Sequence, residues 1–202
     1  MENKMIKTIL ATTVFLCGTT AQADGLYYGG GVSLVQGDSL EGVAGNNSST
    51  DTYGAITGTV GYRWDQTDMF FGAELGADIA VGSDFENGGN TCSDGATGPY
   101  YCEHSATTRL RGIVGMPVGN FEGFASFGFA ASSGSAATSP STSADAVNSG
   151  YTVGLGLQQD FNGNTLRYEL IYDNLETNTT SQGGGYEPTF EAVSLNVSYL
   201  FN

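Results

Sequence analysis

Apolar and polar residues alternate with a period of two along most of the chain. In the segment 69–82, Phe71, Leu75 and Ile79 fall on one face, and Glu74 and Asp78 fall on the other. Because successive side chains of a β-strand point to opposite faces, this pattern predicts a strand with one apolar and one polar face. Eight segments show the pattern: 26–36, 54–64, 69–82, 107–116, 121–132, 150–159, 165–173 and 192–201.

The connections between these segments alternate in length. Short connections lie around 65–66, 117–120 and 162–164. Short turns at one rim and long loops at the other are typical of outer-membrane β-barrels, with both chain ends on the short-turn side. The long polar connections are 37–51, 83–104, 133–148 and 174–188.

Alternation alone does not say which face of each strand is buried. In a water-soluble sandwich or lipocalin-like barrel the apolar face points inward, whereas in an outer-membrane barrel it meets lipid. The polar faces here are small and rich in glycine, with few charges, which suits the narrow interior of an eight-stranded barrel. No Lys follows residue 23, although a solvated face commonly carries Lys. The sequence therefore predicts an all-β fold, an eight-stranded antiparallel up-and-down transmembrane β-barrel with short periplasmic turns and four long extracellular loops.

The N-terminal segment has the features of a secretory leader. Lys4 and Lys7 precede the apolar run 9–17, and a small-residue AQA sequence follows. An N-terminal membrane anchor is the alternative, but the apolar run is shorter than the roughly 20 residues that a spanning helix needs. We expect a signal peptide over 1–23 and a barrel domain over 24–202.

The charge balance excludes several function classes. The chain has 6 basic and 21 acidic residues and a formal net charge of −15. Nucleic-acid binding needs clustered Lys and Arg to neutralise phosphates, so a nucleic-acid partner is not expected. After residue 23 the only basic residues are four arginines: Arg63, Arg109, Arg111 and Arg167.

The catalytic residues that outer-membrane hydrolases commonly use, histidine above all, are nearly absent. His104 is the only histidine, and its neighbours Glu103 and Ser105 point away from it on an extended segment. A Ser/His or Asp/His constellation is therefore not formed by neighbours in sequence. We predict a non-enzymatic protein with no catalytic residues, no metal site and no cofactor.

Two cysteines remain after residue 23, and both lie in one predicted loop. Cys92 and Cys102 are ten residues apart. In an oxidising compartment this spacing predicts a disulfide that closes the loop, worth about 2–3 kcal/mol through restriction of the unfolded chain.

Three segments resemble a known group of proteins. DGLYYGGGVSLV, LRYELIYDN and SLNVSYLFN are similar to segments of eight-stranded outer-membrane barrels of the outer-membrane-protein-A-like and opacity-like families. The alternating Val197, Tyr199 and Phe201 resemble the C-terminal signal that the barrel-assembly machinery reads. The resemblance implies an outer-membrane location in a Gram-negative bacterium, export by the secretory pathway, insertion by that machinery, and contact with membrane lipids and lipopolysaccharide.

The polar faces carry charges that we expect to pair inside the barrel. The segments 69–82 and 107–116 adjoin in an antiparallel pair, which brings Asp78 near Arg109 and Glu74 near Arg111. An unpaired charge in a narrow lumen is costly, so a connected ion-pair plug is expected. A gated ion path through rearranging pairs is the alternative. The proposed network consists of Glu74, Asp78, Arg109, Arg111, Arg167 and Glu169.

Aromatic residues lie near the ends of the predicted strands on their apolar faces. A membrane protein would use them as interfacial girdles, while ordinary strand propensity is the alternative. The predicted girdle residues are Tyr28, Tyr62, Trp64, Tyr151 and Tyr172.

Three roles remain open for such a barrel. A structural role in envelope integrity, as a monomer with a closed lumen, needs only the barrel itself. A surface adhesin or receptor acting through the long loops is a second role, because loops on rigid scaffolds carry specificity. A narrow channel is the third.

Overall fold

The computed structural model describes residues 25–41, 48–91, 100–139, 142–180 and 188–202. The predicted signal peptide over 1–23 lies outside these residues. Among the described residues, no helix is both long and apolar enough to cross a membrane.

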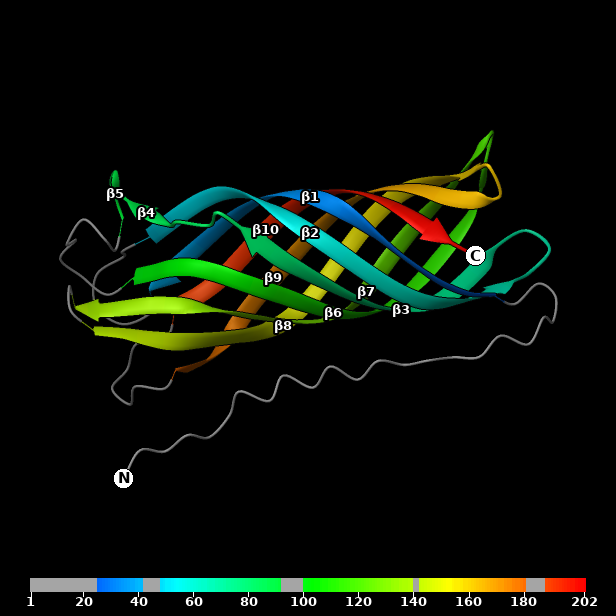
Figure 1. Ribbon diagram of the computed structural model, residues 1–202. Helices are drawn as coiled ribbons and strands as arrows, with labels where there is room; N and C mark the ends of the chain where they lie inside the picture. Colours follow the sequence, from blue (N-terminus) through cyan, green and yellow to red (C-terminus); the bar gives the residue numbers. More distant parts are fainter. Residues whose placement is uncertain (1–24, 42–47, 92–99, 140–141, 181–187) are drawn as a thin grey trace, which may run out of the picture.

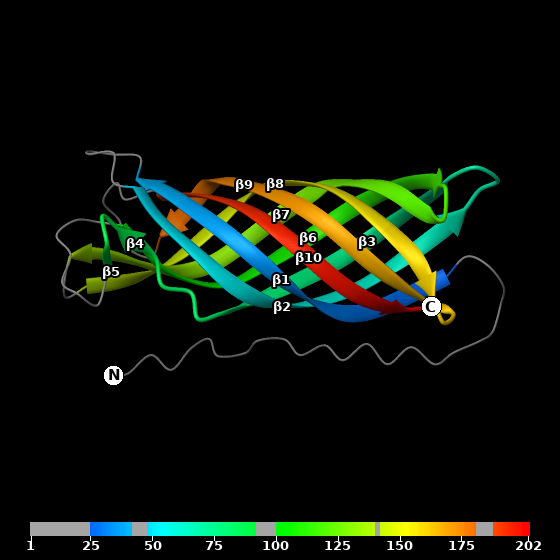
Figure 2. The same ribbon diagram turned by 90° about the horizontal axis from the view of Figure 1, so that it is seen from above.

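Eight long strands form a closed antiparallel barrel, which confirms the predicted fold class (Figures 1 and 2). Each strand pairs with its neighbours in the chain, and β1 pairs with both β2 and β10, which closes the sheet. The short strands β4 (Glu86–Asn87) and β5 (Asn90–Thr91) form a small hairpin beside β2. The barrel strands are β1 (Gly25–Glu41), β2 (Ser48–Asp65), β3 (Phe70–Val81), β6 (Tyr100–Val118), β7 (Phe121–Ser139), β8 (Thr142–Phe161), β9 (Asn164–Thr180) and β10 (Pro188–Phe201).

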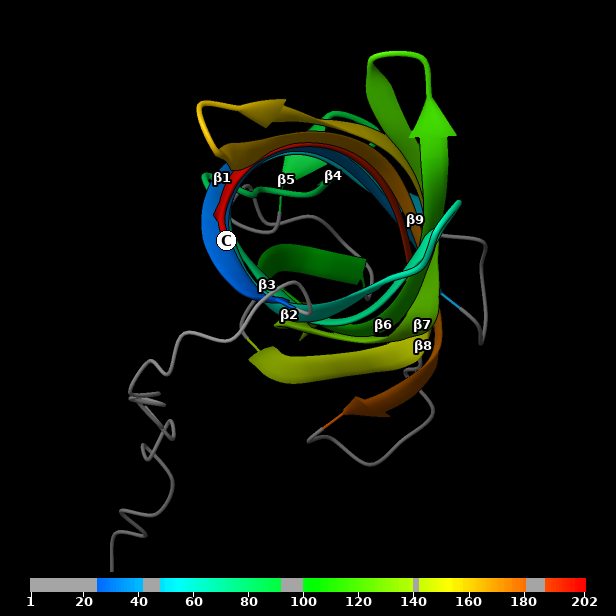
Figure 3. The same cartoon turned by 90° about the vertical axis from the view of Figure 1, so that its right-hand side faces the viewer.

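The two ends of the barrel differ. At one end, which we call the short-turn end, a few residues connect β2 to β3, β6 to β7 and β8 to β9. The last of these turns is Asn162–Gly163, where both residues have positive φ (57° and 79°), as a type I′ hairpin turn requires. The C-terminus and the start of β1 lie at this end, and Figure 3 shows the ring of strands seen from it. We call the opposite end the loop end.

Strand pairing continues further toward the loop end than the sequence predicts. The expected loop over 133–148 is wrong, because β7 runs to Ser139 and β8 begins at Thr142. The expected loops over 37–51 and 174–188 are likewise largely strand. The stretch 133–148 consists mainly of Ala, Ser, Thr and Gly, so its two faces have similar polarity and show no hydrophobic alternation. The stretches 37–51 and 174–188 also contain acidic residues and Asn and have few large apolar residues, so they show no alternation either.

Apolar side chains face outward, as predicted for a barrel that is surrounded by lipid. Leu75 is 53% exposed and its neighbour Glu74 is 1% exposed. The outward apolar side chains form a band around the barrel, which we call the apolar belt: Val32, Leu34, Ile56, Val60, Leu75, Ile79, Leu110, Val114, Phe127, Phe129, Val153, Leu155, Leu170, Val193 and Leu195.

The outer surface becomes more polar beyond the belt at the loop end, although Leu40, Val81 and Val147 are also exposed there. Gln36 on β1, Thr52 on β2, Ser105 on β6, Ser133 on β7 and Glu191 on β10 are exposed there. This change from apolar to polar outward side chains marks the loop-end limit of the belt.

Candidate functional site

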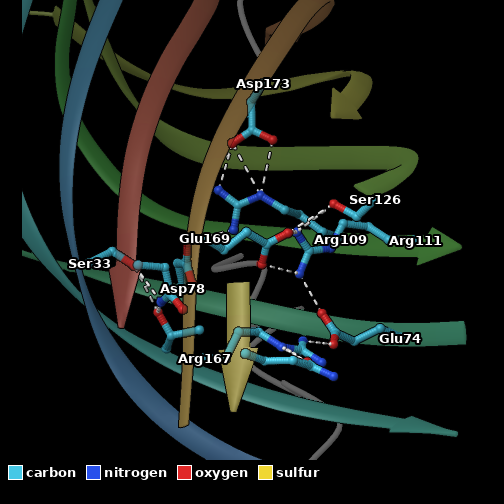
Figure 4. Close-up of polar contacts among 12 residues, drawn as sticks. Ser33, Glu74, Asp78, Arg109, Arg111, Ser126, Arg167, Glu169 and Asp173 are labelled. Carbon is cyan, nitrogen blue, oxygen red and sulfur yellow. Dashed lines mark hydrogen bonds and ion pairs between the residues drawn. The ribbon is translucent and has the colours of Figure 1, made fainter. Parts of the chain in front are cut away.

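The middle of the lumen holds a buried group of charges that we call the Glu74 cluster: Glu74, Arg111, Arg167 and Glu169 (Figure 4). Glu74 on β3 is the backbone partner of Arg111 on β6, so their side chains point into the lumen side by side. Glu74 forms ion pairs with both Arg111 and Arg167, and Arg111 Nη1 lies 2.7 Å from Glu169 Oε1. The cluster therefore joins β3 and β6 to β9 across the lumen.

Two hydroxyl groups complete the hydrogen bonding of these carboxylates. The Tyr27 hydroxyl donates to Glu74 Oε2 at 2.9 Å, and the Ser126 hydroxyl donates to Glu169 Oε1 at 2.9 Å. Buried carboxylates need such partners, because an unpaired buried charge costs several kcal/mol.

A second group of charges lies nearer the loop end, and we call it the Asp78 cluster: Asp78, Arg109 and Asp173 (Figure 4). Arg109 Nη1 lies 2.5 Å from Asp78 Oδ2, and Arg109 Nη2 lies 2.6 Å from Asp173 Oδ2. Arg109 Nε also donates to Asp173 Oδ1 at 3.0 Å, so the guanidinium binds the Asp173 carboxylate through two donors. The three side chains are at most 6% exposed.

The structure thus brings together all six residues of the predicted network, but as two clusters rather than one. Asp173, Tyr27 and Ser126 were missed. Asp173 could have been found, because it continues the inward parity of Arg167 and Glu169 on the same strand. Tyr27 and Ser126 give no signal in the sequence that separates them from other strand residues.

A third polar contact closes the short-turn end of the lumen. Arg63 donates from both terminal nitrogens to Glu122, each at 2.7 Å, and its guanidinium lies 3.9 Å from the centre of the Phe70 ring. Gln158 donates to Glu122 at 2.8 Å and accepts from Arg167 at 3.0 Å. A continuous chain of hydrogen bonds therefore leads from this rim to the Glu74 cluster.

Buried rings close the lumen at the loop end, and we call them the aromatic plug: Tyr53, Phe85, Tyr101, His104 and Phe190. The His104 and Phe190 rings stack with centroids 4.6 Å apart, and Phe85 meets the Tyr101 ring edge-on at 5.0 Å. Phe85 comes from the segment between β3 and β4. Its backbone N–H donates to the Cys102 carbonyl at 2.8 Å, which holds the segment in the mouth of the barrel.

His104 is bonded on both ring nitrogens within this plug. Its Nδ1 lies 3.2 Å from the Tyr101 hydroxyl and its Nε2 lies 2.9 Å from Thr107 Oγ1. His104 lies beyond the apolar belt, between the exposed polar residues Glu103 and Ser105. Burial, together with the nearby positive charge of Arg109, lowers the pKa of His104 to about 4. The imidazole is therefore neutral near pH 7.

Little free space remains in the lumen of the described residues. A cavity of about 20 Å³ lies near the short-turn end beside Arg63 and Arg167. A second cavity, of about 10 Å³, lies between the Asp78 cluster and the aromatic plug. A cavity of this size holds about one water molecule.

The remaining predicted residues lie on the outside of the barrel or at its loop end. Val197, Tyr199 and Phe201 follow one another on the outward face of β10. Cys102 is disulfide-bonded, while its predicted partner Cys92 lies outside the described residues. Among the described residues, no group of three or more His, Cys, Asp or Glu side chains could hold a metal ion.

The predicted girdle residues all point outward, in two bands. At the short-turn end the Tyr28 ring lies 5.6 Å from the ring of Phe201, and the Tyr62 ring lies 4.9 Å from Trp64. Toward the loop end, the Tyr151 and Tyr172 rings are 6.4 Å apart.

An eight-stranded antiparallel barrel with apolar side chains outside and charged side chains inside defines the class of outer-membrane-type β-barrels. The chain is similar in structure to Ail, the attachment invasion locus protein of Yersinia pestis, with a TM-score of 0.51 and 12% identity. That match covers 89% of this chain and 100% of Ail. At this identity the likeness shows the fold, which agrees with the resemblance found in the sequence.

Two other solved structures superpose on the chain with lower TM-scores. The N-terminal β-barrel domain of Pseudomonas aeruginosa OprF has a TM-score of 0.43 and 14% identity, covering 85% of this chain and 97% of that domain. The outer membrane protease OmpT from Escherichia coli has a TM-score of 0.39 and 8% identity, covering 87% of this chain and 95% of OmpT. No protein-family model and no curated protein sequence matches the chain.

Proposed function

We propose that the protein is a non-enzymatic barrel of the bacterial outer membrane, whose role is structural and whose lumen is closed. The observation that supports this proposal most is that apolar side chains cover the outside of the barrel and charged side chains lie inside it. Large apolar side chains such as Leu110 and Leu155 are 60% and 67% exposed, while charged side chains fill the interior. In water, so large an apolar surface would drive aggregation, whereas a bilayer covers it with hydrocarbon.

The aromatic bands support the same placement. Tyr and Trp are enriched where a bilayer meets water, and the two bands lie toward opposite ends of the apolar belt. In this placement the short-turn end faces the periplasm and the loop end faces outward. The lipids and lipopolysaccharide of the membrane then contact the belt, and Val197, Tyr199 and Phe201 serve the barrel-assembly machinery as the insertion signal. The protein acts as a monomer after export by the secretory pathway.

The closed lumen argues against a channel. The Arg63–Glu122 pair, the Glu74 cluster, the Asp78 cluster and the aromatic plug follow one another along the lumen. Ion flow would require several buried pairs to separate at once, and breaking each pair is strongly unfavourable. The two cavities between these clusters, of about 20 and 10 Å³, are each too small for a substrate.

A second role, surface recognition at the loop end, is favoured by one observation. The paired strands β7 and β8 continue past the belt, where the polar side chains of Ser133 and Asp145 are exposed. All four arginines that follow residue 23 lie in the lumen or at the short-turn end, so the described loop-end surface carries only acidic charge. A partner bound there would be neutral or cationic.

The test of the proposed function begins with the outer-membrane fraction of producing cells. Folded barrels migrate differently from boiled chain in a denaturing gel, so we expect two bands that merge on boiling. Recovery from the soluble periplasmic fraction with identical migration would overturn the membrane placement.

Deletion of the gene then separates the two roles. Increased sensitivity to detergent, with unchanged adherence, is the result expected for an envelope role. Loss of adherence with unchanged detergent resistance would favour recognition instead.

A further inference from the structure

The charges of the Asp78 cluster do not balance. Arg109 faces two carboxylates, Asp78 and Asp173, all three at most 6% exposed, which leaves one excess negative charge. The Glu74 cluster differs, because its two arginines face two carboxylates. A buried excess charge is unfavourable unless a counter-charge lies close to it.

One oxygen of this cluster also lacks a hydrogen-bond partner. Asp78 Oδ2 is bound by Arg109, but Asp78 Oδ1 is buried and has no partner among the described residues. Such orphaned carboxylate oxygens are uncommon in folded proteins, because their desolvation is not repaid.

A small cavity lies next to this carboxylate. The cavity of about 10 Å³ is lined by Asp78, Arg109, Tyr53, His104 and Thr107, together with the aliphatic side chains of Val35, Ala55, Ala80 and Ala192. It can hold one particle of the size of a water molecule. Its lining offers a carboxylate and two hydroxyls, oxygen groups of the type that hard cations prefer.

The neighbouring histidine does not supply the missing charge through a direct contact. Both nitrogens of His104 are engaged by hydroxyls, those of Tyr101 and Thr107, and not by a carboxylate. When the Tyr101 hydroxyl donates to Nδ1, Nε2–H donates to Thr107 Oγ1, which keeps a lone pair available for a cation.

We propose that the lumen binds one monovalent inorganic cation, of the size of sodium, in the cavity between Asp78, Tyr53 and Thr107. The cation neutralises the excess charge of the Asp78 cluster and satisfies Asp78 Oδ1. It links the ion pairs in the middle of the barrel to the aromatic plug.

The experiment measures the heat-induced unfolding of the purified full-length protein in detergent, in sodium chloride and in choline chloride at equal ionic strength. Choline is too large for the cavity. At concentrations above the dissociation constant, each tenfold increase in free cation raises the melting temperature of a protein of this size by about 3–6 °C. We expect this rise with sodium and not with choline. Equal melting temperatures in the two salts would show that the cavity holds water only and would overturn the proposal.

The variant Asp78→Asn separates this site from the acidic loops. It removes the excess charge, so the sodium dependence should disappear. The matched control Glu122→Gln removes one carboxylate at the short-turn rim and should keep it. A sodium effect that persists in Asp78→Asn would assign it to other acidic groups and overturn the proposal.

A measurement on the wild-type protein does not depend on the folding of any variant. Crystals grown in sodium chloride should show a density peak beside Asp78 Oδ1 whose distances to oxygen atoms are shorter than the roughly 2.7 Å of an ordinary O–H···O hydrogen bond. Peaks only at exposed carboxylates would contradict the assigned position.

Discussion

Arg111 is the residue on which the Glu74 cluster depends most, because it forms ion pairs with two carboxylates on different strands, Glu74 on β3 and Glu169 on β9. Glu74 has Arg167 as a second cation, but Glu169 has Arg111 alone among the ion pairs of the described residues. Removing Arg111 would therefore leave Glu169 as a buried charge without a cation.

We predict that Arg111→Met lowers the free energy of unfolding by about 3–5 kcal/mol, the usual cost of breaking a buried pair from one side. The measurement is denaturant-induced unfolding in detergent micelles. Arg63→Met is the matched control at the rim, where the pair is part-exposed and a loss of at most about 1 kcal/mol is expected. Equal losses for the two variants would refute the buried network.

His104 gives the barrel a predictable dependence on pH at its loop end. Its pKa is lowered by burial to about 4 in the folded protein, against 6.5 for an ordinary histidine. The unfolded chain therefore takes up the proton first as pH falls. The contribution of neutral His104 is complete above pH 6.5 and is lost as pH falls toward 4. Unfolding midpoints measured from pH 8 to pH 4 should fall more steeply for wild type than for His104→Asn; parallel curves would contradict this account.

Part of the charge clusters could be predicted from the sequence, residue by residue. Period-two parity and antiparallel order placed Glu74 opposite Arg111 correctly. Asp78 is bridged by Arg109 although its backbone partner is Thr107, because the long arginine side chain reaches diagonally across two residues of the neighbouring strand. Whether the charges form one cluster or two depends on which side chains are long enough to meet across the lumen. The alternation of apolar and polar residues does not contain this information.

At the scale of elements, the strands leave room for the charges by carrying glycine where a side chain would collide with them. A Cβ on Gly154 of β8 would lie 2.5 Å from Glu169 Oε1 and 2.5 Å from Ser126 Oγ. A Cβ on Gly58 of β2 would meet nothing within 4 Å.

We therefore predict that Gly154→Val displaces Glu169 and destabilises the barrel by about 1–3 kcal/mol, as overpacking does. Gly58→Val, on the outward face, should be neutral or slightly stabilising. The temperature at which the folded gel band is lost measures both variants. A loss in Gly58→Val as large as in Gly154→Val would show that strand propensity, and not the network, sets the effect.

The segment between β3 and β4 is held in the mouth of the barrel by Phe85. We predict that Phe85→Ala leaves a cavity in the aromatic plug and costs about 3–5 kcal/mol of local stability. Amide hydrogen exchange should speed up at residues 83–87 and 100–104 and stay unchanged around Arg111. Unchanged exchange at 83–87 would show that Phe85 does not hold this segment in place.

The aromatic plug was not predictable from the sequence. Phe85 stands alone in the polar stretch DFENGGN, which gives no alternation and no strand signal. The extensions of β7 and β8 toward the loop end were not predicted for a related reason, because small residues of similar polarity occupy both faces. Periodicity finds an element only where its two faces meet different surroundings.

For the whole molecule, the filled lumen predicts a lack of conductance. Purified protein reconstituted in planar bilayers should show no stable channel openings, because charge clusters and the aromatic plug close the path at several levels. Steady single-channel currents in the wild-type protein would contradict the closed-lumen account.

The whole-molecule fold was the most predictable feature, because it follows from two signals that repeat along the chain. Alternation in eight segments set the strands, and the alternating connection lengths set the two different ends. The choice of which face is buried rested on the small, glycine-rich polar faces and on the absence of Lys after residue 23. The described residues bear that choice out, with the apolar side chains outside.

The central claim is that lipid covers the apolar belt. Its most direct test attaches a nitroxide label to a cysteine placed at Leu75, Leu110 or Leu170 in protein reconstituted into bilayers, and compares collisions with oxygen and with a water-soluble nickel complex. The account predicts high oxygen and low nickel accessibility at all three positions. Frequent nickel collisions with low oxygen accessibility there would place these side chains in water and contradict it.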